Sequence, residues 1–119
     1  MRILFIGSSK IAIPSLDALL NHKHFFVKGI ISQPDKPAGR KKVITPTPLT
    51  SYCNNCDLDV FKPLKIASDI ALNYVKKINP DLIVVVGYGQ FIPSTIINFG
   101  QFKSINLHPS LLPRYRGST

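Results

Sequence analysis

The stretch that decides the fold runs from residue 67 to residue 89 and reads ASDIALNYVKKINPDLIVVVGYG. Apolar residues recur at helical spacing over 67–78, which predicts a helix there, and Asn79-Pro80 is a typical stop. Leu82 to Val86 is continuously apolar and rich in β-branched residues, as in a central parallel strand covered on both faces. This succession of helix and buried strand indicates an α/β fold.

The N-terminal part repeats the alternation. Residues 2–6 form a short apolar run that ends at the turn Gly7-Ser8-Ser9, and Pro14 suits the first turn of a helix that ends near Asn21. A second β-like run covers residues 25–31. A strand, a helix and a strand over about thirty residues have the length of a βαβ unit.

Two further β-like segments, 58–61 and 104–107, complete the predicted sheet. Strands that alternate with helices favour a Rossmann-like, open, parallel sheet, and we expect the strand order 3-2-1-4-5. Residues 32–49 lack periodicity and contain four prolines, so we expect a long irregular loop that serves a function. No helix follows the last strand to cover it, and we therefore expect a truncated chain.

Composition limits the classes of protein. The 119 residues allow one domain, and 45% hydrophobic against 18% charged residues excludes a disordered tail. Fifteen Lys and Arg against six Asp and Glu give a net charge of +9, which favours a nucleic acid or a phosphorylated ligand as partner. No apolar run reaches the roughly 20 residues of a membrane span, and the start lacks a signal peptide. We expect a cytoplasmic protein with no membrane contact.

Two common cofactor signatures are incomplete. The turn at residues 7–12 holds one glycine where a dinucleotide fingerprint needs three, and no acidic residue ends the second strand. Cys53 and Cys56 form one CxxC pair with no second pair to complete a zinc site. We therefore expect no NAD, no metal and two reduced thiols.

Asn106 and His108 are the candidate catalytic residues. Residues two apart in a strand share a face, and Pro109 keeps His108 extended, so both side chains should project together from the carboxyl end of the last strand. An amide and an imidazole there could stabilise an oxyanion and handle a proton. From the residues alone, a solvated pair at the sheet edge is the more common arrangement.

The segment NLHPSLLPRYRG at 106–117 resembles the signature of the formyltetrahydrofolate-dependent transformylase family. The likeness is collinear over the whole chain. Residues 1–7, 14–16, 33–40 and 79–93 are similar to the branch of that family that formylates methionyl-tRNA.

The resemblance implies that residues 1–119 are the N-terminal part of a formyltransferase catalytic domain. The remainder of that domain, with a catalytic Asp, and a C-terminal β-barrel domain would lie beyond Thr119. Asn106 and His108 match two of the family's three catalytic residues. The implied reaction moves a formyl group from 10-formyltetrahydrofolate to the α-amino group of methionyl initiator tRNA, for translation initiation. The formyl donor is a cosubstrate, and no metal is implied.

The resemblance also implies binding residues. The folate-binding segment is matched by Ser110, Leu111, Leu112 and Pro113, and the wall against which the pteridine ring lies by Gly87, Tyr88, Gly89, Gln90, Phe91 and Ile92. Four cations of the 32–49 loop would contact tRNA phosphates: Lys36, Arg40, Lys41 and Lys42. We expect the parent enzyme to be a monomer and residues 1–119 alone to be inactive.

Two alternatives remain open. One is a formyltransferase that acts on a small amine, such as glycinamide ribonucleotide or an amino sugar nucleotide, with the same Asn106 and His108 chemistry. The other is a basic module that binds nucleic acid and catalyses nothing. The basic extension after Gln33 favours tRNA over a small substrate.

Overall fold

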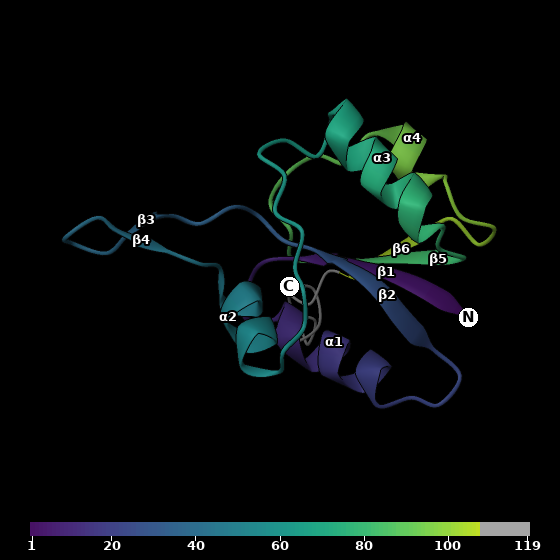
Figure 1. Cartoon of the computed structure of the whole chain (residues 1–119), viewed down its shortest axis with the longest axis horizontal. Coiled ribbons are helices and arrows are strands. Elements are labelled where there is room, and N and C mark those ends of the chain that lie inside the picture. The colour runs from purple at the N-terminus through teal and green to yellow at the C-terminus, as the bar shows by residue number, and fades with distance from the viewer. Residues whose placement is uncertain (108–119) are drawn as a thin grey trace, which may run out of the picture.

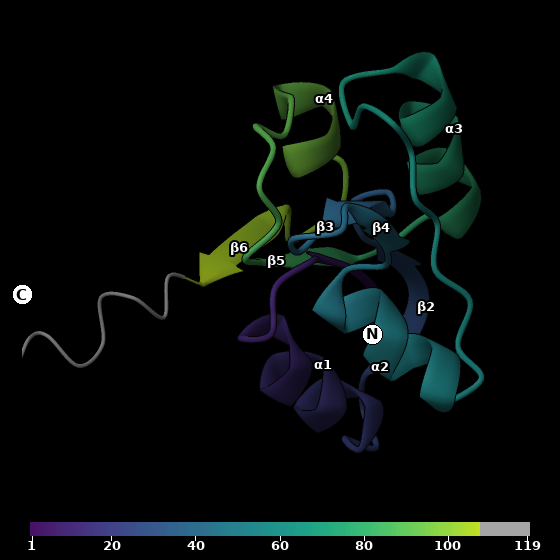
Figure 2. The ribbon, with the colours of Figure 1, turned by 90° about the vertical axis from the view of Figure 1, so that its left-hand side faces the viewer.

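The computed structural model describes residues 1–107, which form a parallel sheet with helices on both faces (Figures 1 and 2). The strands are β1 (Arg2–Gly7), β2 (Phe26–Ile31), β3 (Lys36–Ala38), β4 (Val43–Thr45), β5 (Leu82–Val86) and β6 (Ser104–Leu107). The helices are α1 (Ala12–Leu20), α2 (Pro48–Asn55), α3 (Asp69–Ile78) and α4 (Ser94–Ile97).

The main sheet has the order β2-β1-β5-β6, and all its neighbouring strands are parallel. The predicted α/β class and parallel sheet are confirmed. The predicted third strand, residues 58–61, is wrong as a strand: only Phe61 joins the sheet, through a single bridge to Ile31. Pro63 follows closely and has no N–H to extend that ladder.

Two apolar layers hold the helices to the sheet. Alternate residues of β1 point to opposite faces, so Leu4 and Ile6 pack toward α3 and α4, while Ile3 and Phe5 pack toward α1 and α2. All four side chains are completely buried. A strand covered on both faces must be apolar at every position, which is why β1 and β5 carry unbroken hydrophobic runs.

Residues 32–49 differ most from expectation. The loop that we predict to be irregular contains an antiparallel hairpin in which β3 pairs with β4, from Lys36↔Thr45 to Ala38↔Val43. Gly39 and Lys42 have φ values of 74° and 53°, which lets the chain reverse at the tip. Figure 1 shows this hairpin projecting away from the body of the molecule.

Helix α2 is a second element that the sequence pattern does not predict. Thr47 is its N-cap, Pro48 occupies its first turn and Cys53 lies on its buried face. Cys53 and Cys56 are both free, and burial raises the pKa of the Cys53 thiol to about 11, so it stays protonated at neutral pH.

Neither a membrane span nor a metal cluster occurs in residues 1–107. No helix of this part is long and apolar enough to cross a bilayer. No group of three or more His, Cys, Asp or Glu side chains gathers there in a way that could hold a metal ion.

Candidate functional site

A cleft of about 390 Å³ opens at the carboxyl ends of β5 and β6. Ligands of open α/β sheets bind in this position, because the loops that follow parallel strands diverge there. The cleft is lined by the segment 87–92, by β6 and by neighbouring apolar residues: Ile11, Val85, Gly87, Tyr88, Gly89, Gln90, Phe91, Ile92, Ile97, Ser104, Asn106 and Leu107.

Asn106 is the predicted catalytic residue that the structure describes. It pairs in register with Val85 near the end of β6, is exposed and lines the cleft. The predicted wall, Gly87 to Ile92, lines the same cleft. The structure therefore brings one amide donor and the predicted wall together, whereas His108 and the segment Ser110–Pro113 lie outside the described residues.

Two glycines allow the wall to pack tightly. Ser8 N and Ser9 N both donate to Gly87 O, at 3.0 and 3.1 Å, which ties the turn after β1 to the loop after β5. Gly87 and Gly89 have φ values of 57° and 102°. A Cβ on Gly87 would collide with Ser9 Oγ, so a larger residue would force this contact apart.

Tyr88 forms the inner side of the wall. Its side chain is only 4% exposed and packs in the core beneath α3 and α4. Burial raises the pKa of the Tyr88 hydroxyl to about 12, so the group is neutral at physiological pH. Its hydroxyl has no hydrogen-bond partner within residues 1–107. By contrast, Phe91 is 90% exposed and offers an apolar surface at the mouth of the cleft.

Gln90 uses its side chain to hold the wall in place. Its Oε1 accepts from Ile66 N at 2.9 Å, and its Nε2 donates to Gln33 Oε1 at 3.0 Å and to Leu64 O at 3.2 Å. Because both ends of the amide are occupied, Gln90 contributes shape to the cleft rather than a free polar group.

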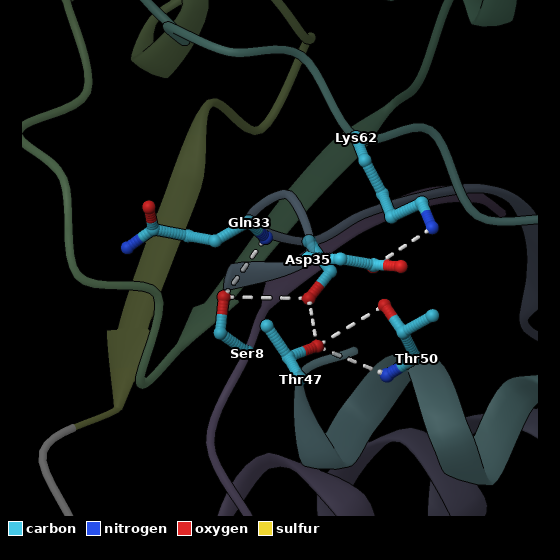
Figure 3. Close-up of polar contacts among 7 residues, drawn as sticks. Ser8, Gln33, Asp35, Thr47, Thr50 and Lys62 are labelled. Atoms are coloured by element: carbon cyan, nitrogen blue, oxygen red, sulfur yellow. Dashed lines mark hydrogen bonds and ion pairs between the residues drawn. The ribbon is translucent and has the colours of Figure 1, made fainter. Parts of the chain in front are cut away.

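The four predicted phosphate-binding cations lie together on the hairpin. Lys36 is on β3, the other three are at the tip, and every one of these side chains is exposed: Lys36, Arg40, Lys41 and Lys42. Asp35, the neighbouring acid, forms its ion pair with Lys62 at 3.0 Å (Figure 3). The positive charge of the hairpin tip is therefore available to an anionic partner.

A chain of hydroxyl groups closes the base of the hairpin, as Figure 3 shows. Ser32 Oγ donates to Ser8 Oγ at 3.3 Å and shares a hydrogen bond with Thr47 Oγ1 at 2.7 Å. Thr47 Oγ1 also accepts from Thr50 N at 3.1 Å and so caps α2. Ser32 precedes β3 and Thr47 follows β4, so both stems are fastened to the turn after β1. Single polar residues in a proline-rich segment gave no periodic signal for this network.

Replacing Thr47 by valine tests the base of the hairpin. The substitution keeps the shape but removes the cap of α2 and leaves the buried Ser32 hydroxyl with a poorer partner. We expect the free energy of unfolding to fall by about 1 to 2 kcal/mol in urea denaturation. Thr45→Val, at an exposed position on β4, is the matched control and should change it by less than about 0.5 kcal/mol. Equal effects of the two substitutions would contradict a structural role of the network.

The fold and the cleft together define the structural class of this protein: a doubly wound α/β domain with its ligand site at the carboxyl edge of a parallel sheet. The sequence profile described as "Formyl transferase" matches residues 1–119, and the chain belongs to this family. The resemblance noted from the sequence is thereby confirmed.

Individual relatives agree with this assignment. The chain is 46% identical over 119 residues to a methionyl-tRNA formyltransferase of Sulfurihydrogenibium sp. (strain YO3AOP1), a match that covers 99% of this chain and 38% of that protein. It is 43% identical over 118 residues to a methionyl-tRNA formyltransferase of Syntrophomonas wolfei subsp. wolfei, which covers 99% and 37% of the two chains. The chain thus spans less than two fifths of the length of these relatives.

A solved structure shares the fold. The phosphoribosylglycinamide formyltransferase from Coxiella burnetii superposes with a TM-score of 0.59 at 16% identity, over 96% of this chain and 53% of that one. At such low identity the likeness concerns the fold alone.

Proposed function

We propose that this chain is the N-terminal part of the catalytic domain of an enzyme that formylates methionyl initiator tRNA for translation initiation. The formyl donor is 10-formyltetrahydrofolate. The observation that carries the proposal is the position of Asn106, an exposed amide that lines the same cleft as the wall formed by residues 87–92. Relatives named methionyl-tRNA formyltransferase match 99% of the chain and support this choice of substrate.

Asn106 provides electrophilic catalysis in this mechanism. The α-amino nitrogen of the methionyl ester attacks the formyl carbon, and negative charge builds on the formyl oxygen. The Asn106 amide donates a hydrogen bond to that oxygen, which stabilises the charge as it develops. The bond from the formyl carbon to the folate nitrogen then breaks, the amine loses a proton and the folate nitrogen gains one.

His108 acts beside Asn106. A protonated imidazole stabilises the charge on the same oxygen, and the carboxylate of the Asp that the family resemblance implies orients it and helps to transfer protons. This reaction needs an oxyanion donor and a proton carrier, and it assigns no step to a metal ion.

The folate lies in the cleft. The pteridine ring rests on Gly87 to Ile92, where Phe91 and Ile92 provide apolar surface. The family resemblance adds the segment Ser110–Pro113 to the folate-binding residues. A flat heterocycle suits a cleft whose lining is mainly apolar with few polar groups. The cations of the hairpin bind the phosphates of the acceptor end of the tRNA. The proposal includes a monomeric enzyme located in the cytoplasm.

A formylation assay on the intact enzyme tests the proposal. With 10-formyltetrahydrofolate as donor, we expect formyl transfer to methionyl initiator tRNA and none to glycinamide ribonucleotide or an amino sugar nucleotide. Transfer to a small amine instead would favour the first alternative. Binding of tRNA with no transfer to any acceptor would favour a non-catalytic module. Residues 1–119 alone should be inactive.

A further inference from the structure

Gln33 connects the hairpin to the wall of the cleft, and no assignment so far includes it. It follows β2 by two residues and precedes β3 by three. Its backbone N donates to Ser8 Oγ at 3.1 Å, which fixes the start of the hairpin against the turn after β1 (Figure 3). The backbone of Gln33 is therefore anchored to the turn after β1, at the base of the projecting hairpin.

The carboxamide of Gln33 contacts three consecutive residues of the wall. Its Nε2 donates to Tyr88 O at 2.9 Å, and its Oε1 accepts from Gln90 Nε2 at 3.0 Å. Between these two residues, Gly89 approaches so closely that a Cβ there would collide with Gln33 Nε2. One partly buried amide thus holds both ends of the Tyr88–Gln90 turn.

Gln33 Oε1 also accepts a hydrogen bond from a residue of the hairpin. Lys36 Nζ donates to Gln33 Oε1 at 3.3 Å, and Lys36 is one of the four cations assigned to tRNA phosphates. Among residues 1–107, Lys36 is the only charged side chain that forms a hydrogen bond with the Gln33 amide. An ammonium on Oε1 polarises the amide and strengthens its N–H donor, because hydrogen bonds in series reinforce one another.

We propose that Gln33 is a positioning residue that shapes the folate wall from the hairpin side by holding Tyr88 O and Gln90 Nε2 at a set distance. The inference rests on the proposed function, since it assigns Gln33 to the folate site. It makes folate affinity depend on a residue that does not itself line the cleft.

The test uses the intact enzyme and the stable isomer 5-formyltetrahydrofolate as probe, with dissociation constants from titration. Gln33→Met keeps the length of the side chain and removes both hydrogen bonds to the wall. We expect its dissociation constant for the probe to rise about tenfold while that for tRNA changes less than about twofold. Gln101→Met, at an exposed glutamine in the turn before β6, is the matched control and should leave both constants unchanged.

Gln33→Glu separates positioning from mere packing. The ionised carboxylate can still accept from Gln90 and Lys36, but it cannot donate to Tyr88 O, whereas the protonated carboxyl can. Relative to the wild type at each pH, its affinity for the probe should recover as the pH falls from about 8 to about 4.5, toward the ordinary carboxyl pKa of about 4.3.

Each outcome decides one question. Wild-type affinity in Gln33→Met, or a ratio for Gln33→Glu that does not change with pH, would overturn the role of Gln33. If Gln33→Met does not fold, the pH profile of Gln33→Glu carries the decision. A wild-type enzyme that binds no folate would overturn the proposed function itself, which is a different result.

Discussion

Replacing Asn106 by alanine is expected to lower the rate constant for formyl transfer by about 100- to 1000-fold, the usual cost of one oxyanion donor. The amide lies at the cleft end of β6 and is exposed, so its removal should leave the buried core intact. Because the hydrogen bond strengthens only as charge develops on the formyl oxygen, the loss should fall on kcat and leave the affinity for folate and tRNA largely unchanged. Single-turnover formylation measures it directly.

Asn55→Ala is the matched control. Asn55 is an exposed asparagine at the end of α2, on a helix that contributes no residue to the cleft, and its loss should leave the rate constant unchanged. A rate within a few-fold of the wild type in Asn106→Ala would remove Asn106 from the mechanism. His108→Ala is expected to lower the rate in the same way.

Neutralising the four hairpin cations is expected to weaken tRNA binding and reduce its salt dependence. When Lys36, Arg40, Lys41 and Lys42 are all changed to glutamine, about four phosphate contacts disappear. Each contact adds about 0.7 to 0.9 to the slope of log K against log salt, so the slope should fall by about 3. Titrations of tRNA at several salt concentrations give this number.

A second charge-matched variant isolates the hairpin from the net charge. Four other lysines are exposed and do not line the cleft: Lys23 precedes β2, Lys28 lies on β2, and Lys76 and Lys77 are in the last turn of α3. Changing these four lysines to glutamine removes the same charge and should alter the slope by much less. If both quadruple variants lower the slope equally, general attraction to a basic protein explains the binding and the hairpin has no special role.

The elements that could be predicted from the sequence are those whose pattern follows from burial. β5 and β1 are covered on both faces and must be apolar throughout. α3 has one buried stripe. The helix begins after its N-cap Ser68 and ends at Asn79, which has a left-handed backbone conformation. In these places a single constraint, the exclusion of water, determines both the residue types and the conformation.

The elements that escaped prediction are determined by polar contacts instead. All residues of β3 and β4 are exposed, so neither strand has a buried face to produce alternation. Pro46 and Pro48 looked like loop residues, although Pro48 starts α2 behind the Thr47 cap. Residues 58–61 have strand-like composition, but only Phe61 finds a partner in the sheet.

The residues of the candidate site also fall into a group that the sequence predicts and a group that it does not. Asn106 and the wall residues stand in contiguous segments at strand ends, where the fold itself indicates ligands, and the family resemblance assigned them roles. The amides of Gln33 and Gln90 meet from positions 57 residues apart, and nothing in either segment alone indicates that contact. Pairwise polar contacts of this kind require the folded arrangement.

Hydrogen bonds close the base of the hairpin, so the hairpin tip can vary independently of the sheet. Ser32 and Thr47 meet at 2.7 Å before the chain leaves the body, so the tip between β3 and β4 can lengthen, shorten or change composition without disturbing the sheet or the contacts of Gln33 with the wall. The entropic penalty of a longer connection grows only with the logarithm of its length. For the proposed enzyme, evolution of this tip alone would change which acceptor is bound and leave the cleft unaltered.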